Sequence, residues 1–260
     1  DTVGWTPASD IVSALEPVKP VTQKAIFGYG TTDTQVSMTN LVNSSGVVAS
    51  DVTGVGTDRA LLAAATYGFD KAIFGYGGNS GGKVSITNLV NNSGVVAADT
   101  TGVGTARQAL SAVGYGGDKA IFAFGTTGSK TNISNLVSNL GVVASDTTGV
   151  GTSRNELAAA SYGVDKGIFG YGSAGSRVSL TNLVSNVGVV SSDVSGVGSA
   201  RRFPSAAGYG GDKGIFGYGH TGSAVSITNL VNNVGTVGSD VSGVGTAREE
   251  LAAAGFSTSA

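Results

Sequence analysis

The sequence contains no cysteine, which excludes a disulfide framework and any metal site built on thiolates. Charged residues are also scarce, because they make up only 12% of the 260 residues and the formal net charge is −2. A nucleic-acid groove needs a basic stripe that replaces counterions, so this composition argues against a nucleic-acid partner. The longest apolar runs, such as Leu61–Ala65, are far too short to span a membrane. The polar surface must therefore come from Gly, Ser, Thr and Asn, with 43 glycines among them.

Five tandem copies of one unit of about 47 residues fill most of the chain. A lysine recurs at Lys24, Lys71, Lys119, Lys166 and Lys213, and an arginine recurs at Arg59, Arg107, Arg154, Arg201 and Arg248. A repeat this long excludes hexapeptide β-helices and collagen, and it leaves propeller blades or helical repeats.

Three segments of each unit read as strands. In the second copy, residues 72–76 are aromatic and β-branched, residues 84–90 alternate apolar with polar, and residues 95–99 are short and rich in β-formers. Between the last two, Asn91–Gly94 has the residues of a hairpin turn. The Ala-rich fourth segment is ambiguous. Residues 246–255 fit either a short capped helix or an innermost strand, and four strands per blade favour the strand.

The two ends of the repeat region complement each other. Residues 16–20 contain two prolines and lack the Ala-rich segment that should precede the first copy, whereas Leu251–Phe256 is an Ala-rich segment with no copy after it. We expect Leu251–Phe256 to complete the first blade and to close a five-bladed, all-β propeller, which removes an aggregation-prone edge. The expected boundaries are an arm at 1–21 and a propeller at 22–260, with repeats 22–69, 70–117, 118–164, 165–211 and 212–260.

The unit resembles a divergent kelch repeat. The arginine, the small-residue inner strand and then a strand such as Lys71-Ala-Ile-Phe-Gly-Tyr-Gly77 follow the kelch order in all five copies. Two features depart from the kelch pattern: Gly-Tyr-Gly replaces the adjacent glycine pair, and the repeats contain no tryptophan. Strings such as Thr-Asn-Leu-Val-Ser-Asn followed by Gly-Val-Val-Ala-Ser-Asp are similar to those of uncharacterised virion proteins of tailed phages. That likeness implies a capsid or tail appendage, located on a virion or outside the cell.

The polar residues that recur have a functional and a structural interpretation. Asp51, Asp99, Asp146, Asp193 and Asp240 each precede a repeat arginine by eight residues. They could form metal or acid sites, but presence in every copy favours a turn cap or a lock between neighbouring blades. A strand asparagine at Asn40, Asn88, Asn135, Asn182 and Asn229 could bind ligand hydroxyls or an adjacent backbone, and the backbone role is favoured.

The segments that differ between copies all join the same two strands and should crowd onto one rim: Thr31–Gln35, Gly78–Lys83, Thr126–Thr131, Ser173–Arg177 and His220–Ala224. Candidate binding residues there are Tyr29, Tyr76, Phe124, Tyr171, Tyr218 and His220. The aromatic rings could stack on sugars, but packing between blades is the stronger alternative. His220 is the sole histidine and has no evident nucleophile or acid partner, so we interpret it as an incidental exposed side chain.

These patterns predict a non-enzymatic structural or adhesive protein with no cofactor, no metal site and no catalytic residues. In the arm, Trp5, Ile11, Val12 and Leu15 are candidates for attachment to other virion or surface proteins. The alternative is a lectin with repeated sites for host-surface glycans, and a homo-oligomer is left open. An enzyme ranks third, because five equivalent copies offer no unique pair of acid and base.

Overall fold

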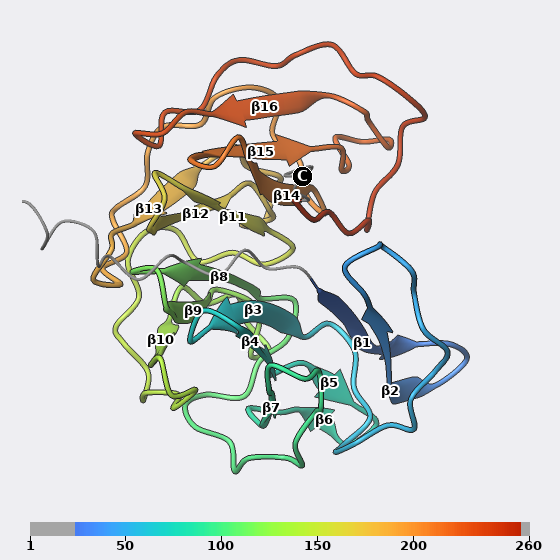
Figure 1. Cartoon of the computed structure of the whole chain (residues 1–260). Coiled ribbons are helices and arrows are strands. Elements are labelled where there is room, and N and C mark those ends of the chain that lie inside the picture. Colours follow the sequence, from blue (N-terminus) through green and yellow to red (C-terminus); the bar gives the residue numbers. More distant parts are fainter. Residues whose placement is uncertain (1–23, 256–260) are drawn as a thin grey trace, which may run out of the picture.

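The computed structural model describes residues 24–255, and these residues form several small antiparallel sheets without any helix (Figure 1). Sheet 1 contains β1 (Ala25–Thr31) and β2 (Gln35–Val42). Sheet 2 contains β3 (Ala63–Tyr67), β4 (Lys71–Gly75) and β7 (Thr87–Val90), and sheet 3 contains β8 (Ser111–Tyr115), β9 (Lys119–Ala123) and β10 (Ser134–Val137). Sheet 4 contains β11 (Ala158–Tyr162), β12 (Lys166–Gly170) and β13 (Thr181–Val184), and sheet 5 contains β14 (Ser205–Tyr209), β15 (Lys213–Gly217) and β16 (Thr228–Val231). A short hairpin, β5 (Gly78–Asn79) with β6 (Gly82–Lys83), lies in the connection between β4 and β7 of sheet 2.

Each three-stranded sheet takes its inner strand from the end of one repeat and its other two strands from the next repeat, and its middle strand pairs on both sides. In sheet 4, Ile168 of β12 lies opposite Ala160 of β11 and Leu183 of β13. The prediction that the Ala-rich segment is an inner strand is therefore confirmed for β3, β8, β11 and β14. Sheet 1 has only two strands, because no described residue pairs with the inner edge of β1.

The segment predicted as the third strand, such as Val95–Asp99, is less regular than expected. Its backbone pairs with that of β7 only at isolated bridges, Val90 with Val96 and Thr87 with Thr100. The turn before it is as predicted: the Oδ1 of Asn91 accepts the backbone N–H groups of Ser93 and Val95. The outer segment therefore follows the sheet without forming a full ladder.

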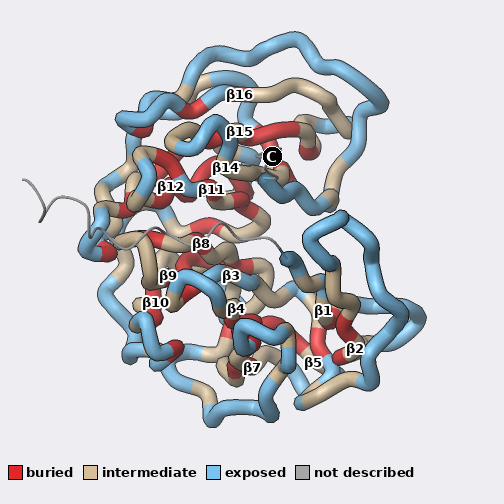
Figure 2. The backbone as a smooth tube through the Cα atoms, in the orientation of Figure 1, coloured by how far each residue is buried: buried red, intermediate tan, exposed pale blue. Residues whose placement is uncertain are grey.

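The five sheets follow one another in chain order around the centre of the view, with sheet 1 and sheet 5 at the two ends of the arc (Figure 1). Neighbouring inner strands lie in contact, β3 with β8, β8 with β11, and β11 with β14. Buried residues gather where sheets face each other, whereas the outer segments are exposed (Figure 2). Taken by itself, this arrangement is a row of antiparallel sheets in which none closes on another.

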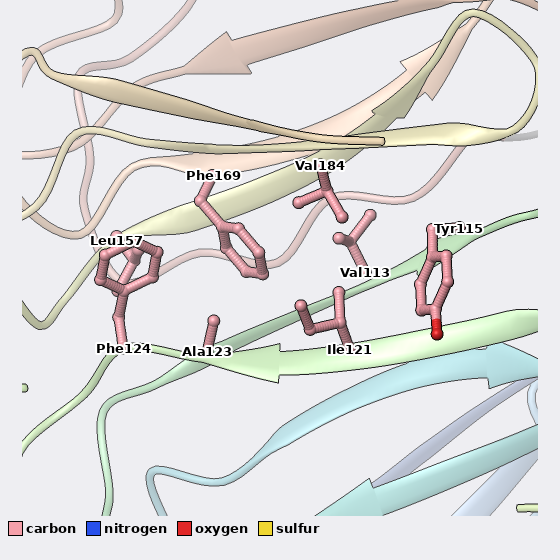
Figure 3. Close-up of a cluster of buried hydrophobic side chains, with 8 residues drawn as sticks. All are labelled: Val113, Tyr115, Ile121, Ala123, Phe124, Leu157, Phe169 and Val184. Carbon is pink, nitrogen blue, oxygen red and sulfur yellow. The ribbon is translucent and has the colours of Figure 1, made fainter. Parts of the chain in front are cut away.

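Large side chains from neighbouring sheets interdigitate to make the core. Between sheets 3 and 4, Phe124 and Ile121 of one sheet pack with Phe169 and Val184 of the other (Figure 3). The glycines that end β4 and β12 make room for this packing, whereas β9 ends at Ala123: a Cβ on Gly75 would lie 2.6 Å from the ring of Phe122, and one on Gly170 would lie 2.6 Å from the ring of Phe216. This close approach explains why glycine recurs within Phe-Gly-Tyr.

Candidate functional site: the junctions between sheets

The recurring polar residues meet between consecutive sheets, in clusters that we call junctions and name after their arginine. The Arg59, Arg107, Arg154 and Arg201 junctions join sheets 1 to 5 in order, and each of these arginines is fully buried. The chain has few charges, so four buried guanidinium groups are its strongest electrostatic feature. The Arg154 junction shows the arrangement of these contacts.

The guanidinium of Arg154 stacks on the preceding sheet and donates to the following one. Its carbon lies 4.2 Å from the ring centroid of Phe124 in sheet 3, a cation–π geometry. Its Nε donates to the carbonyl of Tyr171 at 3.0 Å, and its Nη2 donates to Oδ1 of Asn182 at 2.6 Å, both in sheet 4. Arg154 therefore ties two sheets together.

An aspartate completes the junction without touching its own repeat's arginine. Asp193 of sheet 4 accepts from the backbone N–H of Thr152 at 3.0 Å and from the Thr152 hydroxyl at 2.6 Å. It also accepts from Nδ2 of Asn182 at 3.0 Å and lies 3.7 Å from Nη1 of Arg154. The sequence suggested an Asp–Arg lock, and the partner is the arginine of the preceding repeat rather than the one eight residues downstream. The Arg59 and Arg201 junctions use the same contacts, with Asp99 and Asp240.

The strand asparagines have the structural role that the sequence favoured. Asn182 donates to the carbonyl of Ser191 in the adjacent outer segment, as Asn88 does to Ala97. The sequence did not reveal that the same side chain also accepts from the buried arginine. The Arg107 junction differs in one bond: Nη2 of Arg107 donates to the carbonyl of Phe122 instead of the asparagine, while its Nε donates to the carbonyl of Phe124 as Arg154 does to Tyr171.

Burial and hydrogen bonding shift the pKa values in the junctions. Burial lowers the pKa of Arg154 to about 10, and the charge of Asp193 opposes that shift, so the guanidinium stays protonated at neutral pH. Burial raises the pKa of Tyr76 and of Tyr171 to about 12, although the charge of the nearby arginine acts to lower it. Burial also acts to raise the pKa of Asp193, but hydrogen bonds from Thr152 and Asn182 outweigh it and the pKa is lowered. These groups are held in one charge state and are not poised to exchange protons near pH 7.

The aromatic residues proposed for ligand binding lie within the junctions. Tyr29, Tyr76, Phe124 and Tyr171 are buried under the guanidinium groups, and each ring packs edge-on against a phenylalanine of the next sheet. All five aromatic positions, Tyr218 included, adopt a left-handed backbone with φ between 62° and 65°. This placement favours the packing alternative, because a buried ring offers no face to a sugar. Tyr218 alone is partly exposed.

His220 is placed differently from what the sequence suggested. It is partly buried, and its backbone pairs with Arg202 of the same sheet. The arm residues Trp5, Ile11, Val12 and Leu15 lie outside the described residues, as does Phe256 at the other end. The lysines beside Asp70, Asp118, Asp165 and Asp212 form partly exposed pairs with these aspartates, and such pairs add little to stability.

Residues 24–255 contain no group of three or more His, Cys, Asp or Glu that could hold a metal ion. Within the same range there is no helix of the length and hydrophobicity needed to cross a membrane. In comparisons with known proteins, no family model matches the chain and no curated protein matches it either.

Proposed function

We propose that the chain is a closed five-bladed β-propeller that acts as a non-enzymatic structural or adhesive scaffold. The observation that carries this proposal is a fifth junction whose two halves lie open at the two ends of the row of sheets. One half belongs to sheet 5 and the segment after it, and the other half belongs to sheet 1.

The half on sheet 5 already has the internal contacts of a junction. The guanidinium of Arg248 stacks 4.2 Å from the ring centroid of Tyr218, and its Nη1 donates to the carbonyl of Thr246 at 3.1 Å. Arg248 is exposed, unlike the buried arginines of the four junctions between sheets 1 and 5. It lacks, among the described residues, the asparagine and aspartate of a following sheet.

The half on sheet 1 supplies those two groups. Asn40 donates to Oδ1 of Asp51 at 2.8 Å and to the carbonyl of Ala49 at 3.1 Å, as the asparagines of the made junctions do. Phe27, which corresponds to the buried phenylalanines of sheets 2 to 5, is 55% exposed. Closure would place Phe27 against Tyr218 and would give Arg248 the Oδ1 of Asn40.

The apolar contacts between sheets are also unmatched at these ends. In four turns a glycine approaches a leucine of the preceding sheet, for example Gly94 with Leu41. A Cβ on Gly46 would meet nothing within 4 Å, and its expected partner Leu230 is 45% exposed. Between sheet 5 and sheet 1, both the polar and the apolar contacts of a junction are therefore missing.

The C-terminal segment lies where a closing strand should begin. A Cβ on Gly255 would lie 2.5 Å from the carbonyl oxygen of Gly208 in β14, and the equivalent Gly208 in turn approaches Ser161 of β11. Residues 251–253 line a hollow of about 190 Å³ together with β14. Residues 251–255 form no strand, but they lie against β14, the strand that would be their neighbour in a ring. We propose that this segment then pairs with the open edge of β1.

A pair of engineered cysteines tests the closure, because the chain has no cysteine of its own. Thr246→Cys with Asp51→Cys should form a disulfide within one chain, as should the matched pair Thr152→Cys with Asp193→Cys at a junction already made. A monomeric cross-link in both variants supports the ring. If only the second pair cross-links within the monomer, and the first gives dimers or nothing, the ring proposal fails.

The scaffold role follows from how the recurring residues are used. The buried arginines, asparagines and aspartates bind one another, so they fix the frame, and the segments that vary connect the same two strands in every sheet. Together with the resemblance to phage virion proteins, this supports a virion appendage that presents a rigid head, with residues 1–21 as a tether. Deletion of residues 1–21 should abolish attachment to the particle and leave the urea unfolding midpoint unchanged. A lowered midpoint would make these residues part of the fold.

The second candidate is a lectin that uses the varied strand connections as repeated sites. The bridges of Thr126 with Lys130, Ser173 with Arg177 and His220 with Ala224 hold three of these loops in one geometry, which favours a repeated surface. A glycan array separates the candidates, since weak repeated sites gain avidity on a dense surface. Absence of binding there would eliminate the lectin and leave the scaffold.

A further inference from the structure

One polar cluster of the molecule is not part of the repeated frame. It is formed by Asn155 and Glu156, which precede β11, and by Arg202 and His220 of sheet 5. The backbones of Arg202 and His220 pair, with N to O distances of 3.2 and 2.9 Å. Nη1 of Arg202 lies 3.7 Å from Oε2 of Glu156, and Nδ2 of Asn155 donates to Oε1 of Glu156 at 3.2 Å. Glu156 therefore connects Asn155 with Arg202 across two neighbouring sheets, and the backbone pairing places His220 beside Arg202.

Each of these side chains has a buried polar atom without a hydrogen-bond partner: Oδ1 of Asn155, Oε2 of Glu156, Nε of Arg202 and Nδ1 of His220. Among the described residues, the other unpaired buried atoms belong to the junctions, in Arg59, Asn135 and Arg201. Buried polar groups in folded proteins nearly always have a partner. A concentration of four unpaired atoms in one place indicates a site that a ligand completes.

The equivalent positions in sheets 2 and 3 lack this chemistry, and a glutamate recurs at this place only in the last copy, as Glu250. Where sheet 4 has Asn155 and Glu156, sheet 2 has Ala60 and Leu61, and sheet 3 has Gln108 and Ala109. The position of His220, the sole histidine of a chain with 12% charged residues, is Thr126 in sheet 3. The frame does not need these side chains, because the sheets that lack them fold in the same way.

The unpaired atoms define what a ligand must offer. Glu156 and Asn155 present oxygen acceptors, Arg202 presents an N–H donor, and His220 can do either according to its tautomer. The charges of Glu156 and Arg202 cancel, so a charged ligand gains little. Neighbouring hydroxyl groups on a neutral molecule match this set, because each hydroxyl both donates and accepts. The partly exposed ring of Phe203, with the Arg202 guanidinium carbon 5.2 Å from its centroid, adds an apolar surface beside the polar atoms.

We propose that this cluster is a single binding site for a neutral saccharide. Glu156 and Asn155 accept hydrogen bonds from sugar hydroxyls, and Arg202 donates one. The Arg202 side chain is 39% exposed and its 3.7 Å contact with Glu156 is longer than a hydrogen bond, so this side chain moves aside to admit the ligand. The proposal deepens the carbohydrate-binding alternative but assigns one site, and it depends on neither ring closure nor particle attachment.

The test follows backbone amide shifts in ¹⁵N-labelled full-length protein titrated with the methyl glycosides of glucose, galactose and mannose at millimolar concentrations. At least one sugar should shift the amides of residues 155–156, 202–203 and 220. Glu156→Ala and Arg202→Met should each weaken that binding at least tenfold. The matched control Gln108→Ala, at the position equivalent to Asn155, should leave it unchanged.

Three results would overturn the proposal. If no amide shifts with any of these sugars, only water would remain as a partner for the unpaired atoms. Amide shifts of equal size at all five varied loops would favour the repeated lectin sites, and an unchanged sugar affinity in both Glu156→Ala and Arg202→Met would also contradict a site at this cluster. If Glu156→Ala lowers the unfolding midpoint, Asn155→Ala with His220→Ala replaces it under the same criterion. None of these results bears on the cysteine test of closure, so the two proposals fail separately.

Discussion

Arg154 and Arg248 occupy the same place in their repeats and stack on an aromatic ring at the same distance, 4.2 Å. Arg154 is fully buried, whereas Arg248 is exposed. The difference comes from the following sheet, which supplies Asn182 and Asp193 to Arg154. Burial of the arginine is therefore a property of two sheets in contact and not of one repeat, and the two positions can be compared by matched substitutions.

Replacing the arginine should give the largest effect. Arg154→Met leaves Asp193 and Asn182 without their partner and should lower the free energy of unfolding by about 3–5 kcal/mol. In a closed ring, Arg248→Met should cost a comparable amount, measured by urea unfolding. A cost below about 1 kcal/mol for Arg248→Met, typical of an exposed residue, would show that the fifth junction is not made.

Adding a methyl group to the junction glycine should have the next largest effect. Gly151 and Gly245 have φ values of +79° and +83°, so alanine is strained by about 1–2 kcal/mol at both. A Cβ on Gly151 would also lie 2.4 Å from Oδ1 of Asp193, which brings the expected loss for Gly151→Ala to about 2–4 kcal/mol. At Gly245 the nearest atom is the Tyr218 hydroxyl at 3.7 Å. If Gly245→Ala lowers the thermal unfolding midpoint as much as Gly151→Ala does, Asp51 lies against Gly245 as Asp193 lies against Gly151. A smaller decrease for Gly245→Ala contradicts closure.

Acid should weaken the junctions through their aspartates. Hydrogen bonds lower the pKa values of Asp99, Asp146, Asp193 and Asp240 below the ordinary 3.8, against the opposing effect of burial. A lowered pKa in the folded state gives stability that is present above pH 3.8 and is lost as the pH falls through the folded value. The urea concentration at the midpoint of unfolding should therefore decrease as the pH is lowered below about 5. Asp193→Asn should make that fall shallower than in the unsubstituted protein. Equal slopes would refute this assignment.

Removing one hydroxyl should give the smallest effect. Tyr76→Phe loses the hydrogen bond from the Tyr76 hydroxyl to the carbonyl of Val103 and should cost about 1 kcal/mol. Sheet 3 already carries Phe124 at this place, so the ring itself is accepted. The corresponding bond from Tyr218 to Val244 is exposed, and Tyr218→Phe should cost less than Tyr76→Phe unless the ring closes over it. Chemical denaturation of both variants measures the difference.

Much of this architecture could be predicted from the sequence, because the repeat and the alternation of apolar residues are local signals. The inner strands, the turn at Asn91 and the structural use of the aspartates follow from them. The partner of Asp193 could not be found, since Thr152 and Arg154 are about 40 residues upstream and the nearer Arg201 lies in a different junction. The irregular outer segment at Val95 was also missed, because β-propensity does not report whether a ladder is complete.

The cluster around Glu156 left a weaker signal. Its members are separated by up to 65 positions, and each looks unremarkable where it stands. The available clue was that Glu156 stands where the first, second and fourth copies have Leu61, Ala109 and Phe203. His220 was noticed, but only the pairing with Arg202 brings it beside a charged neighbour.

The junctions also differ in how far apart their residues lie along the chain. Arg154 meets Asn182 after 28 residues, so each of the first four junctions can form as soon as the next sheet is synthesised. Arg248 and Asn40 are separated by most of the polypeptide, and bringing them together carries the entropy of a much longer loop. In the proposed ring, folding should therefore proceed from one sheet to the next and end with the fifth junction as the slow step. A circular permutant that joins the present ends and opens the chain between sheets 3 and 4 should transfer that slow step to the Arg154 junction.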